Sequence, residues 1–346
     1  MTMAVRATDL LYETPGGLYC PPGDFFIDPS RKAARAVITH GHSDHARAGH
    51  EKVLATAETL AVMAARLGRR FAVAGQPLAY GETVRVGEVA VSLYPAGHVI
   101  GSAQVCLEWR GLKIVVTGDY KRKPDPTTVP FEVVPCDVFV TEATFGLPVY
   151  RHPPAEREIA KLILSLETFP ERPHLLGAYS LGKAQRLIGE VRAAGFDGPV
   201  HVHRAVEPIC RLYERFGVDL GPLEPAENLD AEAARGAVVV CPPMAMKDAW
   251  AAGFDDPVSV AASGWMQLVT HRLSSGAHLP LVLSDHADWP DLCATIAETG
   301  AEEIWIVHTS TGSLRALGHW CSQRGLVAHP PPGVDDVQPA LPGLGL

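Results

Sequence analysis

The sequence lacks several features that would define its class at once. It contains no pair of cysteines in C-x-x-C spacing, and its seven cysteines are odd in number and scattered. This is not the pattern of a disulfide framework, so the thiols are predicted to be reduced and mostly buried. No stretch approaches the roughly 18 uninterrupted apolar residues of a membrane span, and the first residues contain no apolar run of signal-peptide length. These absences favour a cytoplasmic protein without a membrane partner.

Positive charge is also in short supply. Lys and Arg number 30 against 39 Asp and Glu, which gives a net charge of −9. A protein that coats nucleic acid non-specifically is usually basic, so that function is disfavoured. An acidic chain can still be a nuclease, because bound divalent cations would cancel negative charge locally. With 47% hydrophobic and 20% charged residues, the composition is that of a folded globular protein.

Short β-branched runs recur along the chain, and each ends at or just before a polar side chain. The polar residues at these ends are His40, His98, Asp119, Glu142, Asp285, His286 and His308. Helical patterns lie between some of the runs, at 156–166, 182–194 and 290–299. Strands that alternate with helices predict an α/β protein, and polar side chains just past strand ends predict a site held on a rigid sheet.

Residues 146–284 differ from the sequence on either side. They contain two of the helical patterns and more turn residues, but few of the candidate ligands. We interpret them as a cap domain inserted into a first domain, which is formed by residues 1–145 and 285–335. Residues 281–308, which begin with the apolar run at 281–283, are predicted to return the chain to the sheet of the first domain. A proline-rich tail follows at 336–346 and is predicted to be extended or loosely ordered.

The strongest single signal is the segment HGHSDH at 40–45, which directly follows a predicted strand. Its ligand-type side chains are those of His40, His42, Asp44 and His45. Alternate residues of a tight loop can project in related directions, so one short segment can serve two metal centres. His98 in a glycine-flanked turn and Asp119 in a Gly-Asp turn follow at later strand ends. Each alone would more often be structural, but their order after the first motif favours metal ligation.

In these motifs the chain resembles the metallo-β-lactamase superfamily, and its distal half resembles the β-CASP group of that superfamily. The matching positions are Asp28, the segment 40–45, His98, Asp119, Glu142, His286 and His308. Within the group the chain is most similar to the bacterial ligase-associated DNA exonucleases, which are related to repair nucleases of the Artemis and Apollo type. The resemblance implies an αββα metallo-β-lactamase sandwich with an inserted β-CASP cap domain.

The ligand-type residues predict a site for two divalent metal ions. We assign His40, His42 and His98 to one ion, Asp44, His45 and His308 to the other, and Asp119 to a bridge between them. Nitrogen-rich sites of this kind suit Zn²⁺, with Mn²⁺ as the alternative. Asp28 is interpreted as a carboxylate that orients a ligand histidine.

Glu142 and His286 remain once the metal ligands are assigned. A phosphodiester needs its leaving oxygen protonated, and His286, oriented and kept protonated by Glu142, can supply that proton. The alternative is that His286 has only a structural role. The match to the β-CASP group favours catalysis.

Three further residues are candidates for binding substrate. Ser180 and Lys183 follow a predicted strand and open a helix, in a segment that resembles one by which the repair nucleases hold a terminal phosphate. The alternative is that Ser180 caps the helix and Lys183 is solvated. Trp265 can stack on a base or pack as a partly buried side chain. His201 and His203 resemble a metal pair, but we interpret them as structural because they lie in the cap.

The favoured function is that of a metal-dependent nuclease in DNA repair, which hydrolyses single-stranded DNA from a 5′-phosphate end in the 5′-to-3′ direction. An RNA endonuclease or exonuclease is the alternative, because RNA-cutting members of the group have a histidine in the last motif, here His308. The large cap and the Glu142–His286 pair disfavour a small-molecule hydrolase, and the complete ligand set disfavours a non-catalytic binding module. The resemblance also implies functional association with an ATP-dependent DNA ligase and a helicase.

Overall fold

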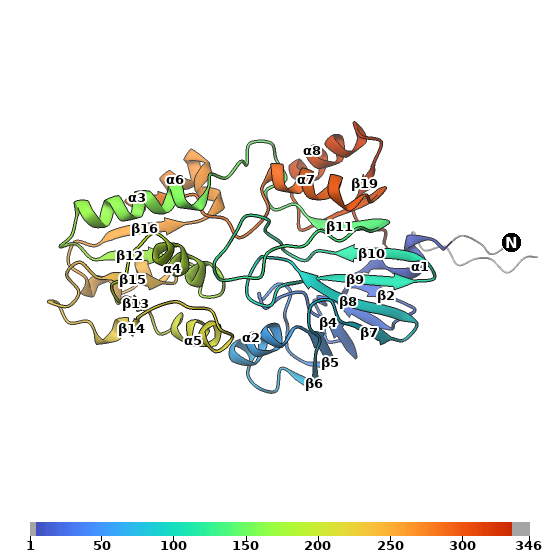
Figure 1. Ribbon diagram of the computed structural model, residues 1–346, viewed down its shortest axis with the longest axis horizontal. Helices are drawn as coiled ribbons and strands as arrows, with labels where there is room; N and C mark the ends of the chain where they lie inside the picture. The colour runs from blue at the N-terminus through green and yellow to red at the C-terminus, as the bar shows by residue number, and fades with distance from the viewer. Residues whose placement is uncertain (1–4, 334–346) are drawn as a thin grey trace, which may run out of the picture.

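The computed structural model describes residues 5–333, so the predicted tail at 336–346 lies outside the described residues. Two sheets pack face to face on one side of the molecule, and a third sheet with its own helices lies beside them (Figure 1). We call this third sheet, together with helices α3 to α6, the cap. Among the described residues, no helix is long and apolar enough to cross a membrane.

The first sheet is formed by the N-terminal part of the chain, and its strands lie in chain order. They are β1 (Tyr12–Thr14), β2 (Gly17–Cys20), β3 (Phe25–Ile27), β4 (Arg35–Val37), β5 (His50–Ala55) and β6 (Ala72–Pro77). Helix α1 (Ala7–Leu10) precedes it, and α2 (Ala57–Leu67) covers its outer face through a cluster that includes Ile38, Val53 and Met63.

The second sheet has the order β19-β18-β11-β10-β9-β8-β7. Its strands are β7 (Thr83–Val86), β8 (Val89–Pro95), β9 (Ala103–Trp109), β10 (Leu112–Val116), β11 (Val138–Glu142), β18 (Glu303–Val307) and β19 (Val327–His329). Strand β18 pairs in parallel with β11, although the whole cap separates the two strands in sequence. Helices α7 (Trp289–Thr299) and α8 (Thr311–Ser322) lie against the outer face of this sheet (Figure 1).

Alternation along the strands divides the apolar side chains between two layers. Ile114 and Val116 of β10 belong to the core between the two sheets, whereas Val115 belongs to the core under α7 and α8. Successive side chains of a strand point to opposite faces, so one short run supplies both layers. The layers are therefore helix, sheet, sheet and helix, which confirms the predicted αββα sandwich.

The cap contains a parallel sheet with the order β14-β13-β15-β12-β16-β17. Its strands are β12 (His174–Gly177), β13 (Val200–Val202), β14 (Leu223–Pro225), β15 (Val238–Cys241), β16 (Val258–Ala262) and β17 (Leu279–Leu281). Its α-helices are α3 (Ala155–Thr168), α4 (Lys183–Ala193), α5 (Glu207–Arg215) and α6 (Val269–Ser275). Short 3₁₀ turns are η1 (Ala226–Asn228), η2 (Ala245–Lys247), η3 (Ala251–Gly253) and η4 (Gly264–Gln267).

The predicted α/β class with an inserted cap is confirmed, and one strand assignment is corrected. The helical patterns at 156–166, 182–194 and 290–299 correspond to α3, α4 and α7. The predicted segment 281–308 does return to the first domain's sheet, through β18, which pairs with β11. The apolar run at its start does not, because the strand there is β17 and it pairs with β16 of the cap. The limits of the predicted domains, 1–145, 146–284 and 285–335, stay a prediction.

Candidate metal centre

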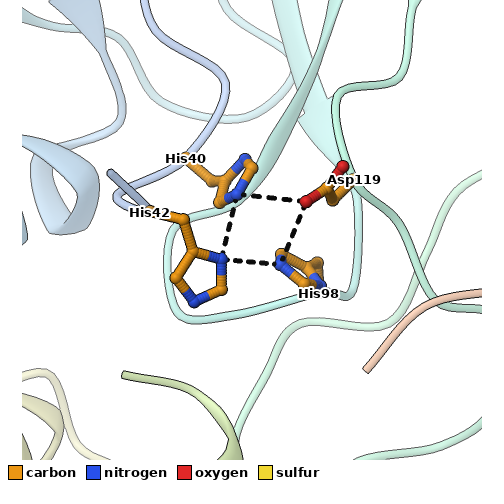
Figure 2. A group of neighbouring side chains, drawn as sticks. All are labelled: His40, His42, His98 and Asp119. Atoms are coloured by element: carbon orange, nitrogen blue, oxygen red, sulfur yellow. Dashed lines mark hydrogen bonds and ion pairs between the residues drawn. The ribbon is translucent and has the colours of Figure 1, made fainter. Parts of the chain in front are cut away.

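Three histidines and an aspartate converge in the loops that follow strands β4, β8 and β10. Their ligand atoms lie within 4.8 Å of one another, in the group His40, His42, His98 and Asp119. Figure 2 shows the four side chains turned toward a common centre. All of them are buried except His42, which is half-buried. Three separate strand ends thus supply the group that the sequence assigned to the first ion and the bridge.

The outward-facing nitrogen of each histidine lies against an oxygen atom. The contacts are His40 Nδ1 to Thr39 Oγ1 at 3.1 Å, His42 Nε2 to the Leu181 carbonyl at 3.2 Å, and His98 Nδ1 to the Asp285 carbonyl at 2.7 Å. A carbonyl oxygen only accepts hydrogen bonds, so His42 and His98 donate through these nitrogens. Their other nitrogens then face the centre, and oxygen partners of this kind hold metal-binding histidines in place.

The inward-facing nitrogens fit a bound cation. His42 Nδ1 lies 3.1 Å from His40 Nε2 and 3.0 Å from His98 Nε2. Burial lowers the pKa of His42 to about 4 and keeps the pKa values of His40 and His98 well below their ordinary range, so the rings are neutral. In neutral rings, His42 and His98 aim two lone pairs at each other. A divalent metal ion satisfies such lone pairs, and three imidazoles with a carboxylate suit it well.

His45 extends the site on the side of Asp28. Its Nδ1 lies 2.7 Å from Asp28 Oδ2, and its Nε2 lies 3.5 Å from Asp119 Oδ2. The Nε2 atom is buried without a hydrogen-bond partner, as expected of a metal ligand, and the assignment of His45 stays a prediction. Burial acts to lower the pKa of His45, but the hydrogen bond to Asp28 and the nearby carboxylates raise it to about 9.

Asp28 is itself firmly placed. Its carboxylate accepts hydrogen bonds from the Thr39 N–H at 2.8 Å and the Thr39 hydroxyl at 2.6 Å. Its φ of +45° lies in the left-handed region that few residues other than glycine adopt, and Asp is among those that tolerate it. The structure therefore places Asp28 where it orients His45, the arrangement expected of a carboxylate behind a ligand histidine.

Asp44 and His308 lie around His45 but outside the compact group of four. Asp44 Oδ2 is 3.8 Å from His45 Nε2, and the Asp44 side chain is 67% exposed. The His308 ring stacks on the His45 ring with 4.6 Å between centroids. All three residues line a cavity of about 570 Å³. Their assignment to a second ion stays a prediction.

Glu142 and His286 form a pair directly beside the histidine cluster. The buried Glu142 carboxylate lies 3.0 Å from His286 Nδ1, and it accepts hydrogen bonds from the Tyr120 N–H and the Thr144 hydroxyl. The His286 ring centroid is 4.7 Å from that of His98. Burial acts to lower the pKa of His286, but the charge of Glu142 raises it to about 9. In turn, His286 holds the pKa of Glu142 below its usual range despite burial.

The structure does not support the phosphate-binding role predicted for Lys183. Its side chain is 6% exposed, and its ammonium donates to the Leu283 carbonyl at 2.6 Å and contacts Asp285 Oδ1 at 3.0 Å. An ammonium enclosed in this way is not accessible to the 5′ end of a nucleic-acid strand in solvent. The alternative roles are wrong as well, because Lys183 is not solvated and α4 is capped at Gly182 rather than at Ser180. Ser180 remains half-buried in the loop before α4.

Lys183 belongs to a buried ionic network that sequence analysis missed. Its other members are Lys121, Asp125, Arg186, Glu190 and Asp285. Arg186 contacts Asp125 at 3.5 Å and Asp285 at 3.3 Å, so one guanidinium joins the cap to both neighbouring segments. Asp285 in turn accepts the His98 N–H through its carbonyl. A sequence signal was available only at Asp285, which directly precedes His286.

Comparisons with known proteins bear on the family. No protein-family model matches the chain. The chain is 31% identical to a probable DNA ligase from Opitutus terrae over 323 residues, which is 90% of this chain and 30% of the relative. Over 114 residues it is 35% identical to an endoribonuclease from Aspergillus fumigatus, covering 32% of this chain and 13% of the relative. The chain thus spans less than a third of the length of either curated relative.

A solved structure extends the comparison to the fold. A protein of unknown function from Enterococcus faecalis superposes with a TM-score of 0.60 and 14% identity, over 86% of this chain and 79% of that chain. Together the structure shows an αββα sandwich, an inserted cap, and a histidine cluster that could hold a metal ion. This fold and the similarity to these relatives match the metallo-β-lactamase superfamily and its β-CASP group. This confirms the family expected from the motifs.

Proposed function

We propose that the chain is a metal-dependent nuclease that hydrolyses single-stranded DNA from a 5′-phosphate end in the 5′-to-3′ direction, as a step in DNA repair. One observation supports the chemistry above all others. The Glu142–His286 pair lies beside the metal-ligand cluster, with 4.7 Å between the ring centroids of His286 and His98. This proximity supports a proton donor that acts next to the group that fits a divalent cation.

The residues of the chain have separate roles in this mechanism. Two divalent ions, Zn²⁺ or Mn²⁺, held by His40, His42, Asp44, His45, His98, Asp119 and His308, would supply activated water and neutralise the charge of the phosphate. Glu142 holds Nδ1 of His286 and keeps the ring protonated, which leaves Nε2–H to protonate the leaving oxygen. Asp28 fixes the orientation of His45, so that Nε2 faces Asp119.

DNA is favoured over RNA by the extent of the similarity. The relative that matches 90% of the chain is a probable DNA ligase, whereas the endoribonuclease matches 32% of the chain. The ligase also supports functional association with an ATP-dependent DNA ligase, and the resemblance adds a helicase. These partners, like cytoplasmic localisation, are part of the proposal.

An RNA nuclease is the second candidate, and two observations favour it. One is the similarity of part of the chain to an endoribonuclease. The other is His308, the histidine that RNA-cutting members of the group have in the last motif, which here stacks on His45. The active-site chemistry would be the same, so the distinction lies in how the strand is recognised.

Digestion of end-labelled single strands tests both candidates. We would compare DNA and RNA, each with a 5′-phosphate or a 5′-hydroxyl, with added Zn²⁺ or Mn²⁺ and with Asp119→Ala as the inactive control. The proposal expects 5′-labelled mononucleotides as the first product from phosphorylated DNA. Internal fragments from RNA, with DNA left intact, would establish the second candidate instead. Cleavage that persists in Asp119→Ala or in chelator would contradict both.

A further inference from the structure

The cap contains a cavity of about 440 Å³ that the proposed mechanism does not use. It lies over strand β16, between residues that follow the carboxyl ends of β12 and β15 and the end of α6. From β12 the chain continues to β13, toward the β14 edge of the sheet, whereas from β15 it continues to β16, toward the β17 edge. The direction of the connections therefore reverses beside β12. Open parallel sheets bind ligands at the carboxyl ends of their strands where the order reverses.

Two exposed rings form the walls of the cavity. Tyr179 is 69% exposed and Trp265 is 37% exposed, although aromatic side chains of this size are usually covered. The floor is made of small residues and thioethers, among them Gly177, Ala261 and Met246. A cavity lined by two exposed aromatic rings and small residues is the kind of surface on which an unpaired base stacks.

The charge of the cavity fits a polyanion, in contrast to the rest of the chain. Among the described residues that line it there is no Asp or Glu, although the chain carries a net charge of −9. Its ionisable residues are Lys247 and His271, both exposed. The cavity beside His45 is lined instead by three carboxylates, those of Glu13, Asp28 and Asp44. The cavity in the cap can therefore accept a phosphate group beside Lys247 without a metal ion.

Both rings are linked to the active site, Trp265 by ring contacts and Tyr179 through the chain. The Trp265 ring packs on Phe145 with 4.6 Å between centroids, and Phe145 lies 6.1 Å from the ring of His286. Tyr179 lies two residues before Leu181, whose carbonyl accepts the His42 N–H. One intervening ring thus separates the cavity from the proton donor, which places it within reach of a nucleotide neighbouring the cleaved bond.

We propose that this cavity binds one unpaired base of the substrate strand, next to the nucleotide that is cleaved. Tyr179 and Trp265 stack on the base, and the Lys247 ammonium contacts the adjoining phosphate. This inference rests on the proposed nuclease function and adds to it a subsite for a single-stranded substrate. A paired base has its faces covered by its neighbours in the duplex, so the subsite selects for unpaired strands.

The test uses residues whose side chains are exposed, so that folding is preserved. Tyr179→Ala and Lys247→Gln are the test variants. Phe169→Ala, another exposed aromatic of the cap, and Lys52→Gln, an exposed lysine of β5, are the matched controls. The substrates are thymidine oligonucleotides in which one abasic position is moved stepwise along the strand. Tyr179→Ala should raise KM on the order of tenfold with little change in kcat, as loss of one stacked base predicts.

The abasic series gives the decisive comparison. In the unmodified protein, one abasic position near the cleaved bond should raise KM by a similar factor, and Tyr179→Ala should show no further loss at that position. Hydrolysis of bis(4-nitrophenyl) phosphate, which has no base, should be the same in the control variants Phe169→Ala and Lys52→Gln as in the unmodified protein. Equal abasic sensitivity in the unmodified protein and Tyr179→Ala, or equal effects of Tyr179→Ala and Phe169→Ala, would overturn the subsite.

A binding measurement separates failure of the subsite from failure of the proposed function. Fluorescence of 2-aminopurine within an oligonucleotide is quenched when the base stacks on an aromatic ring. Quenching should occur with the unmodified protein and be lost in Tyr179→Ala, whether or not the strand is cleaved. Quenching without cleavage of DNA or RNA would contradict the nuclease proposal and retain the subsite. Cleavage without quenching at any position would do the reverse.

Discussion

Nε2 of His42 lies 3.2 Å from the carbonyl oxygen of Leu181, so a backbone atom of the cap sets the tautomer of a predicted metal ligand in the other domain. A second backbone carbonyl, that of Asp285 just after the cap, accepts a hydrogen bond from His98 in the same way. Ligand histidines depend on such partners for their orientation. The cap therefore takes part in positioning a predicted metal ligand.

Replacing Asp28 by Asn should weaken metal binding by about 10–100-fold, because the carboxylate that orients His45 is lost. Competition with a chromogenic chelator measures this affinity. Asp24→Asn is the matched control, since Asp24 also has a positive φ, +50° against +45° for Asp28, but contacts no predicted ligand. Equal affinities in the two variants would remove the role of Asp28.

His286→Gln should lower kcat by about 10²–10⁴-fold while both metals stay bound, as expected for loss of a proton donor. Burial works against protonation of His286, but Glu142 raises its pKa to about 9. The protonated form is therefore present at neutral pH and is lost as the pH rises through about 9, so activity should fall there. In Glu142→Gln this alkaline limb should move to lower pH. A variant of His286 with an empty metal site would show a structural role instead.

Lys183→Met should reduce activity equally on 5′-phosphorylated and 5′-hydroxyl DNA. The variant removes the donor to the Leu283 carbonyl and one partner of Asp285. A buried polar group left without a partner costs roughly 1–3 kcal/mol, so urea denaturation should show a loss of stability of this size. A loss confined to 5′-phosphorylated DNA would restore the phosphate-binding role.

The cysteines should resist thiol reagents in the folded protein. Burial raises the pKa of each thiol to about 11 or 12, so thiolate is scarce at pH 8. Titration with Ellman's reagent should detect almost no thiol in the native chain and all seven after denaturation. Rapid reaction of one or more native thiols would contradict their burial.

Sequence analysis predicted most where the information is local. The segment 40–45 carries four ligand-type residues within one loop, and the helix patterns of α3, α4 and α7 have clear ends. It failed where the outcome depends on partners far away in the chain. The run at 281–283 was apolar, but an apolar run does not specify which sheet it joins, and β17 pairs with β16.

Lys183 shows the same limit for a side chain. Its place in the first turn of a helix suggested an anion site. The local sequence does not show its enclosing partners, because they come from a different segment. Leu283 and Asp285 reach it only through the fold. The ionic network likewise joins Asp125 to Arg186, two residues that no local pattern relates.

The parallel pairing of β11 with β18 determines when the second sheet can be completed during folding. Register partners such as Glu142 and Val307 lie on either side of the whole cap. During synthesis, β11 emerges long before β18, and the edge of β11 that will pair with β18 remains unpaired while the cap is translated. Such an edge invites pairing with other chains. A chain cut short before β18 should therefore aggregate even with a folded cap. Folding of the cap brings its two ends together, so that a shorter loop has to be ordered when β18 pairs with β11.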